Sequence, residues 1–195
     1  MVELKKVTAP DNRTDEELVR LMLAGHGDVF AEIYLRYYSR AFRLAYGMTG
    51  NRESAEDLTQ EIFMRTYRKI ALFKGESEFS TWFYRLAVNI SLNYRRRERN
   101  RASEDITDMD LLVAPGPPKQ MESKIYQKQI QSQVQRALLS LKPKWRVIII
   151  LKDIEGLSYE EIAERVNCST GTIASRLNRA RKLLAQKLSH LKETI

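Results

Sequence analysis

A proline-rich segment near the middle of the chain divides the sequence into two parts. Residues 114–118 have the sequence Ala-Pro-Gly-Pro-Pro and follow a short acidic stretch. Proline lacks an amide donor and favours extended backbone, so we interpret residues 102–121 as a linker. The linker leaves residues 1–101 and 122–195 as two small domains, each long enough to bury a core of its own.

Apolar residues recur at helical spacing throughout the first domain and predict four helices before the linker. The first two are separated by Gly25-His26-Gly27, which is typical of a tight turn. The third should open near Asn51 or Ser54, because both are good N-cap residues and acidic side chains follow them. Ser80 is a candidate cap for the fourth.

The second domain begins with a helix that Pro143 interrupts. The β-branched run Val147–Leu151 fits a buried strand as well as a buried helix, and periodicity alone does not choose between them. Ser158 and Glu161 form the pattern of a capping box and predict a short helix. After an interruption at 167–171, a long helix should run on from Thr172. We therefore expect a helix-rich second domain.

The long final helix has an apolar stripe and a polar, basic face opposite it. The stripe consists of Ile173, Leu177, Ala180 and Leu184. The opposite face carries Ser175, Asn178, Arg179 and Lys182, with Arg176 at its flank. Arginine can donate two hydrogen bonds to guanine, asparagine can pair with adenine, and lysine neutralises phosphate. A solvated helix face is the alternative, but the capped helix and turn before it favour a helix-turn-helix that recognises duplex DNA.

A second basic cluster ends the fourth predicted helix of the first domain. Arg95, Arg96 and Arg97 follow a stretch that contains Trp82, Phe83 and Tyr84. Aromatic rings stack on unpaired bases and arginines bind phosphates, so the combination suggests contact with opened, single-stranded DNA. The alternatives are that the aromatic residues belong to the core and that the arginines stabilise a helix C-terminus.

Composition and charge agree with a polyanionic partner. The net charge is +8 and the pI is near 9.6. No Gly-rich phosphate loop is present, and His26, His190 and Cys168 are isolated in sequence, so we expect no enzyme activity, no cofactor and no metal. With no apolar run of membrane-spanning length, we expect no membrane insertion and a location in the cytoplasm.

Motifs in both domains match one family. They are AEDLTQEIF at 55–63, FKGESEFSTWFYRLAVN at 73–89, and LSYEEIA at 157–163 with GTIASRLNRAR at 171–181. Together they resemble the extracytoplasmic-function (group IV) sigma factors of bacterial RNA polymerase, over nearly the whole chain. The resemblance implies an all-α fold with two small helical domains, sigma region 2 and sigma region 4, and it makes Val147–Leu151 a helix. It implies a transcription initiation factor with no catalysis of its own.

The resemblance also implies roles for individual residues. The residues expected to bind the largest subunit of core RNA polymerase are Asp57, Gln60, Glu61 and Phe63. The residues expected to melt and recognise the minus-10 promoter element are Phe73, Trp82, Phe83, Tyr84, Asn89, Asn93, Arg95, Arg96 and Arg97. The residues expected to recognise the minus-35 element, in double-stranded form, are Thr172, Ser175, Arg176, Asn178, Arg179 and Lys182.

The sequence departs from the family pattern at two positions of the last motif. Family members often have a basic residue where this chain has Ala174 and an aromatic residue where it has Asn178, which leaves the preferred promoter sequence open.

An anti-sigma factor is expected as a further partner, by resemblance only. The alternative is a dimeric DNA-binding regulator whose first domain senses a ligand or a protein; such a regulator would bind promoter DNA without polymerase.

Overall fold

The structure, a computed structural model, describes residues 12–101 and 118–189, and none of these residues lies in a β-strand. Short 3₁₀ turns of the first domain lie at Gly27–Val29 and Ile70–Leu72. The helices are α1 (Asp15–Leu23), α2 (Phe30–Thr49), α3 (Arg52–Lys69), α4 (Phe79–Arg101), α5 (Pro118–Leu139), α6 (Pro143–Ile149), α7 (Tyr159–Val166) and α8 (Thr170–Lys187). No described helix is long and apolar enough to cross a membrane. The expected all-α fold with two helical domains is confirmed.

Local side-chain caps explain where four of the eight described helices begin, namely α1, α3, α7 and α8. Asn51 caps α3 by accepting a hydrogen bond from the Ser54 amide at 2.8 Å, as expected. The helix α4 begins at Phe79, one residue before Ser80, so the expected Ser80 cap is wrong. The last residues of the predicted linker, from Pro118 onward, are helical, because proline is tolerated in the first turn, where its missing amide has no helical acceptor to lose. The rest of the predicted linker lies outside the described residues.

The first domain is a bundle in which α2, α3 and α4 enclose an aromatic core. Phe79 and Phe83 are fully buried, and Tyr37 contacts both rings edge-on or tilted at 5.6 and 4.6 Å. The Tyr37 hydroxyl donates a hydrogen bond to Asp15 on α1. Burial and this carboxylate raise the pKa of Tyr37 far above its usual value. The bond therefore fastens α1 onto the bundle.

The second domain resolves the ambiguity at Val147–Leu151. These residues continue α6 into a π-helical turn over Ile150–Ile154, so the strand alternative is wrong and the helix implied by the resemblance is confirmed. Ser158 and Glu161 form the predicted capping box of α7, with hydrogen bonds of 3.1 and 2.8 Å. The helix α8 starts at Thr170, two residues earlier than predicted, because Ser169 caps it.

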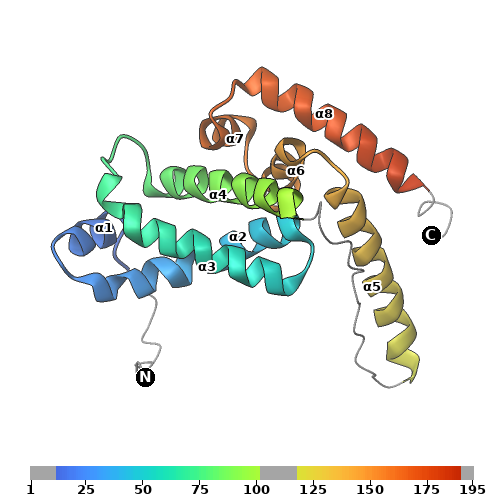
Figure 1. Ribbon diagram of the computed structural model, residues 1–195, viewed down its shortest axis with the longest axis horizontal. Coiled ribbons are helices and arrows are strands. Elements are labelled where there is room, and N and C mark those ends of the chain that lie inside the picture. Colours follow the sequence, from blue (N-terminus) through green and yellow to red (C-terminus); the bar gives the residue numbers. More distant parts are fainter. Residues whose placement is uncertain (1–11, 102–117, 190–195) are drawn as a thin grey trace.

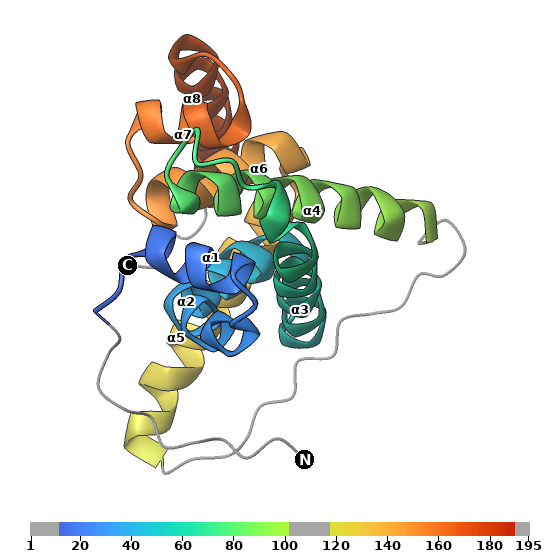
Figure 2. The ribbon, with the colours of Figure 1, turned by 90° about the vertical axis from the view of Figure 1, so that its left-hand side faces the viewer.

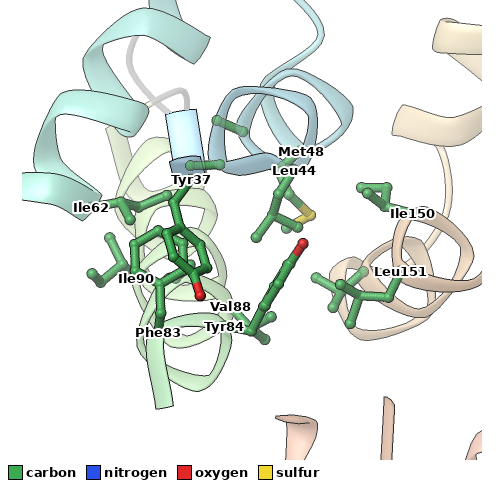
Figure 3. Packing of buried hydrophobic residues seen from close by; sticks show 14 of the residues in the cluster. Tyr37, Leu44, Met48, Ile62, Phe83, Tyr84, Val88, Ile90, Ile150 and Leu151 are labelled. Carbon is green, nitrogen blue, oxygen red and sulfur yellow. The ribbon is translucent and has the colours of Figure 1, made fainter. Parts of the chain in front are cut away.

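The two domains pack against each other and share one continuous core. Both ribbon views place α4 between the first three helices and α7, with α8 on the outer side (Figure 1 and Figure 2). Figure 3 shows the ring of Tyr84 between Met48 of α2 and Leu151 of the second domain. Arg146, which is 1% exposed, donates hydrogen bonds to carbonyls at the ends of both α2 and α5. A buried guanidinium thus joins the two domains.

Candidate docking groove and nucleic-acid interfaces

An open groove of about 760 Å³ runs between α2 and α3 on the face of the first domain away from the second. Its floor is aromatic and its rim is charged. The lining residues are Phe30, Tyr34, Tyr38, Glu56, Asp57, Thr59, Gln60, Phe63, Met64, Tyr67 and Arg68. A groove of this kind, with apolar rings at its centre and polar groups around them, fits a protein partner.

The groove contains three of the four residues expected to bind polymerase. Asp57 and Gln60 are exposed, while Phe63 is 4% exposed and lies under Tyr34, at a ring-centroid distance of 4.6 Å. Partial burial, and then the neighbouring Tyr38, raise the pKa of Tyr34. The structure therefore gives Phe63 the role of supporting the groove floor.

Glu61 lies apart from the groove, on the side of α3 that faces α4. Its carboxylate accepts hydrogen bonds of 2.8 Å from Arg97 and forms an ion pair with Arg65 at 2.6 Å. The guanidinium of Arg97 also lies 6.0 Å from the ring centroid of Tyr94. In this arrangement Glu61 orients an arginine of the second basic cluster, so the residues expected to bind polymerase divide between two faces of α3.

The aromatic residues at the start of α4 separate into buried and half-exposed members. Phe73 and Trp82 are half-buried and their ring centroids lie 5.7 Å apart. Phe83 is fully buried among Tyr37, Phe63 and Phe79, so its ring cannot stack on a base, and its expected contact with the minus-10 element is wrong for this arrangement.

Tyr84 is 2% exposed because the second domain covers it. The Arg165 guanidinium carbon lies 4.7 Å from its ring centroid, and its hydroxyl donates a 3.3 Å hydrogen bond to Glu155. Burial, with the Glu155 carboxylate nearby, raises the pKa of Tyr84 to about 12. Tyr84 is thus an element of the contact between the domains.

Further along α4, the polar residues expected at the minus-10 element lie on the surface. Asn89, Asn93, Arg96 and Arg97 are all exposed, and the side chain of Arg95 lies outside the described part of the chain. Asn89 also lines a groove of about 290 Å³ between α4 and the second domain, where Arg176 and Cys168 form the opposite wall. Candidate residues for two different promoter elements therefore meet at one groove.

The helix-turn-helix is formed by α7 and α8, joined through Asn167, which has the left-handed backbone angle φ of 52°. Of the predicted apolar stripe, Ile173, Leu177 and Ala180 are buried, and Leu184 is half-buried against the core. The expected DNA-binding residues of the opposite face, Ser175, Asn178, Arg179 and Lys182, are all exposed, and Thr172 is half-buried. Arg176 differs from them because it is half-buried and its Nη1 lies 3.3 Å from Cys168 Sγ.

Sequence reasoning missed the groove residues on α2 and the far end of α3. Tyr34 and Tyr38 are one helical turn apart, as are Met64 and Arg68, and this spacing places each pair on one face. Tyr34, Met64 and Tyr67 are large apolar side chains that are 39 to 51% exposed. Their helical spacing was a usable signal, but it did not show which face the core leaves uncovered.

Two family models match the chain. Sigma-70 region 2 matches residues 33–101 and Sigma-70, region 4 matches residues 131–184. The ECF RNA polymerase sigma factor SigE of Mycolicibacterium smegmatis is 35% identical over 204 aligned residues, covering 100% of this chain and 78% of that protein. SigW of Bacillus subtilis is 33% identical and covers 89% of this chain and 96% of its own. The chain belongs to the extracytoplasmic-function sigma factors.

Solved structures agree with this assignment. The sigma factor RpoE of Bartonella quintana, determined in complex with the anti-sigma factor NepR, superposes with a TM-score of 0.60 at 25% identity, over 82% of this chain and 96% of that one. In this sigma factor the first domain contains region 2, matched at residues 33–101, and the second domain contains region 4, matched at residues 131–184. As in its relatives, its activity is to direct transcription initiation at promoters, and it is not an enzyme.

Proposed function

We propose that this group IV sigma factor binds core RNA polymerase through the groove between α2 and α3 and recognises promoters with α4 and α8. The observation that carries the proposal is the helix-turn-helix, in which a capped α7 supports an α8 whose polar, basic face is exposed at Ser175, Asn178, Arg179 and Lys182. Polymerase contacts are assigned to Asp57, Gln60 and the exposed aromatic rings of the groove floor, with Phe63 beneath them. The protein would act in the cytoplasm, with domain boundaries at 101 and 118.

For the minus-10 element we assign the half-exposed pair Phe73 and Trp82 and the polar surface of α4. The polar residues are Asn89, Asn93, Arg95, Arg96 and Arg97. A half-exposed ring suits stacking on an unpaired base, and the exposed asparagines and arginines further along the helix suit base edges and phosphates. Tyr84 becomes available only if region 4 moves away from it.

For regulation we propose an anti-sigma factor as a partner. The similarity to a sigma factor solved with NepR supports this, because the matching fold spans most of both chains. The exposed aromatic groove offers such a partner a surface that competes with polymerase.

The core-dependence of DNA binding tests the proposed function against the regulator alternative. A library of duplexes randomised over both promoter elements is incubated with the protein alone or with core polymerase of the same bacterium. We expect specific sequences to be enriched only with polymerase. Equal enrichment of the same sequences by the protein alone would favour the regulator.

Two substitutions on α8 should separate base recognition from phosphate binding. Arg179→Ala should weaken the free energy of DNA binding by about 1–3 kcal/mol. It should also relax the base preference at one position of the minus-35 element, because an arginine that contacts a base edge discriminates between bases. Lys182→Ala should weaken binding to all sequences alike. It should also lower, by about one, the slope of the logarithm of the binding constant against the logarithm of the salt concentration. The measurement is holoenzyme selection from a library randomised over that element, at several salt concentrations. If Arg179→Ala selects the same sequences as wild type, its assignment to base recognition is incorrect.

A further inference from the structure

The carboxylate of Glu61 lies between two arginines that come from different helices. Its Oε1 atom lies 2.6 Å from Nη2 of Arg65, which follows one turn later on α3. The Nη2 atom of Arg97, on α4, donates to both carboxylate oxygens at 2.8 Å. The side chain of Glu61 is 20% exposed, so these ion pairs are partly shielded from water. Charge-assisted bonds in such a place hold a side chain more firmly than bonds at a fully exposed position do.

The contact with Glu61 uses only part of the Arg97 guanidinium. The central carbon of that group lies 6.0 Å from the ring centroid of Tyr94, three residues earlier on α4. The Nε and Nη1 atoms of Arg97 have no hydrogen-bond partner among the residues that the structure describes, and the side chain is 50% exposed. Arg97 is therefore held at one nitrogen, while its other donors remain available to a ligand at the surface.

Arg65 keeps this cluster positively charged. Two guanidiniums and one carboxylate carry a net charge of +1, whereas Glu61 and Arg97 alone would be neutral and would attract a phosphate less strongly. Both guanidiniums bind the same oxygen, Oε1, so without the carboxylate they would repel each other and turn apart. Glu61 is thus the group that keeps Arg97 in its present orientation.

A fixed orientation favours DNA binding by an arginine. The long side chain loses much of its rotamer freedom when a ligand immobilises it, and an arginine that the protein already holds loses less. Glu61 can supply this effect because it points to α4, whereas the adjacent Gln60 lines the groove between α2 and α3. One helix therefore carries a polymerase-docking face and a second face that organises a DNA-binding side chain.

We propose that Glu61 is a positioning residue for the minus-10 element and that it acts through Arg97. The carboxylate orients Arg97 before DNA binds, and this leaves Nε and Nη1 to bind phosphate oxygens of the opened strand. The inference rests on the assignment of Arg97 to the minus-10 element under the proposed function. It gives Glu61 a role different from the polymerase contact that the sequence led us to expect.

A double-mutant cycle tests the coupling between the two side chains. Holoenzymes are assembled from saturating core polymerase and the full chain, as wild type, Glu61→Ala, Arg97→Ala or both. The probe is a promoter fragment selected by the wild-type holoenzyme, with its minus-10 segment left unpaired, and its dissociation constant is measured at several salt concentrations. Glu53→Ala is the matched control, because it removes the same charge from an exposed position in the first turn of α3.

Charge alone and positioning predict opposite signs for Glu61→Ala. Loss of a carboxylate makes the protein more positive, which by itself would strengthen DNA binding. We expect instead that Glu61→Ala weakens binding about fivefold and Arg97→Ala about tenfold, with the double variant within about twofold of Arg97→Ala. Both single variants should lower, by up to about one, the slope of the logarithm of the binding constant against the logarithm of the salt concentration. Glu53→Ala should bind the probe at least as tightly as wild type.

A further variant protects the test against a folding defect. Glu61→Gln keeps the size of the side chain and one acceptor oxygen, so it takes the place of Glu61→Ala in the cycle if the alanine variant loses helical circular dichroism. Because a neutral amide holds a guanidinium less firmly than a carboxylate does, Glu61→Gln should weaken DNA binding about twofold.

Additive effects in the cycle, or unchanged or tighter DNA binding by Glu61→Ala, would overturn the inference. If Glu61→Ala weakened only the binding of core polymerase, its carboxylate would be a polymerase contact and the inference would again fail, while the proposed function would stand. Unchanged DNA binding by Arg97→Ala would contradict the assignment of Arg97 in the proposed function, and this inference with it. The two failures are therefore distinguishable.

Discussion

Met64→Glu should weaken binding of core RNA polymerase at least tenfold, which corresponds to about 1.4 kcal/mol. Met64 is 47% exposed in the groove between α2 and α3, beside the Tyr34 and Tyr67 rings that line the same groove. A carboxylate there would have to lose its hydration against aromatic surface when the partner docks. The measurement is a titration of labelled sigma factor with core polymerase, monitored by fluorescence anisotropy.

Leu72→Glu is the matched control for this substitution. Leu72 is an exposed apolar residue of the same region, 65% exposed, and it does not line the groove. Both variants should keep their helical circular dichroism, because neither side chain is part of the core. Equal polymerase affinities for Met64→Glu, Leu72→Glu and wild type would show that polymerase binds elsewhere.

Arg146→Met should lower the free energy of unfolding by about 3 kcal/mol, which is a fall in Tm of about 6–12 °C for a chain of this size. The guanidinium donates to the carbonyls of Met48 at 2.7 Å, Leu138 at 3.0 Å and Leu141 at 3.1 Å. These carbonyls lie at the ends of helices from both regions, where a cation also interacts favourably with the helix dipole. Methionine fills similar space but leaves buried acceptors without donors.

Arg52→Met provides the comparison at an exposed position. Arg52 pairs with Glu56 across one turn of α3 and is 83% exposed, so its loss should leave the free energy of unfolding almost unchanged. Thermal unfolding followed by circular dichroism gives both values. A small effect of Arg146→Met, comparable with that of Arg52→Met, would mean that water replaces the guanidinium or that the regions do not stay packed in solution.

Features that depend on a few neighbouring residues were predictable from the sequence. The capping box of Ser158 and Glu161 and the Asn51 cap depend on side chains three residues apart, and both predictions are confirmed. The polar face of α8 follows from helical periodicity and is exposed as predicted. Val147–Leu151 was ambiguous because every residue in it is apolar, so neither periodicity stands out, and its environment is supplied by other helices.

Features that depend on distant parts of the chain were not predictable. Arg146 contacts a carbonyl 98 positions away, and an arginine beside a proline-initiated helix gives no local sign that it will be buried. Within the aromatic motif, Phe83 is fully buried and the adjacent Trp82 half-buried, because successive residues point in different directions from α4 and the core covers only one of them. The division of α3 between Gln60 and Glu61 has the same origin.

The position of Gly47 within α2 limits which residues can replace it. Glycine inside a helix is less favourable than alanine by about 1 kcal/mol, and Gly47 lies within α2, so region 2 alone would gain stability from the larger residue. The intact chain would not, because the added Cβ collides with Ile150. The stability of region 2 alone and the packing of the two regions therefore have opposite requirements at this one position. A residue larger than glycine at this position therefore requires a different path for the turn that carries Ile150.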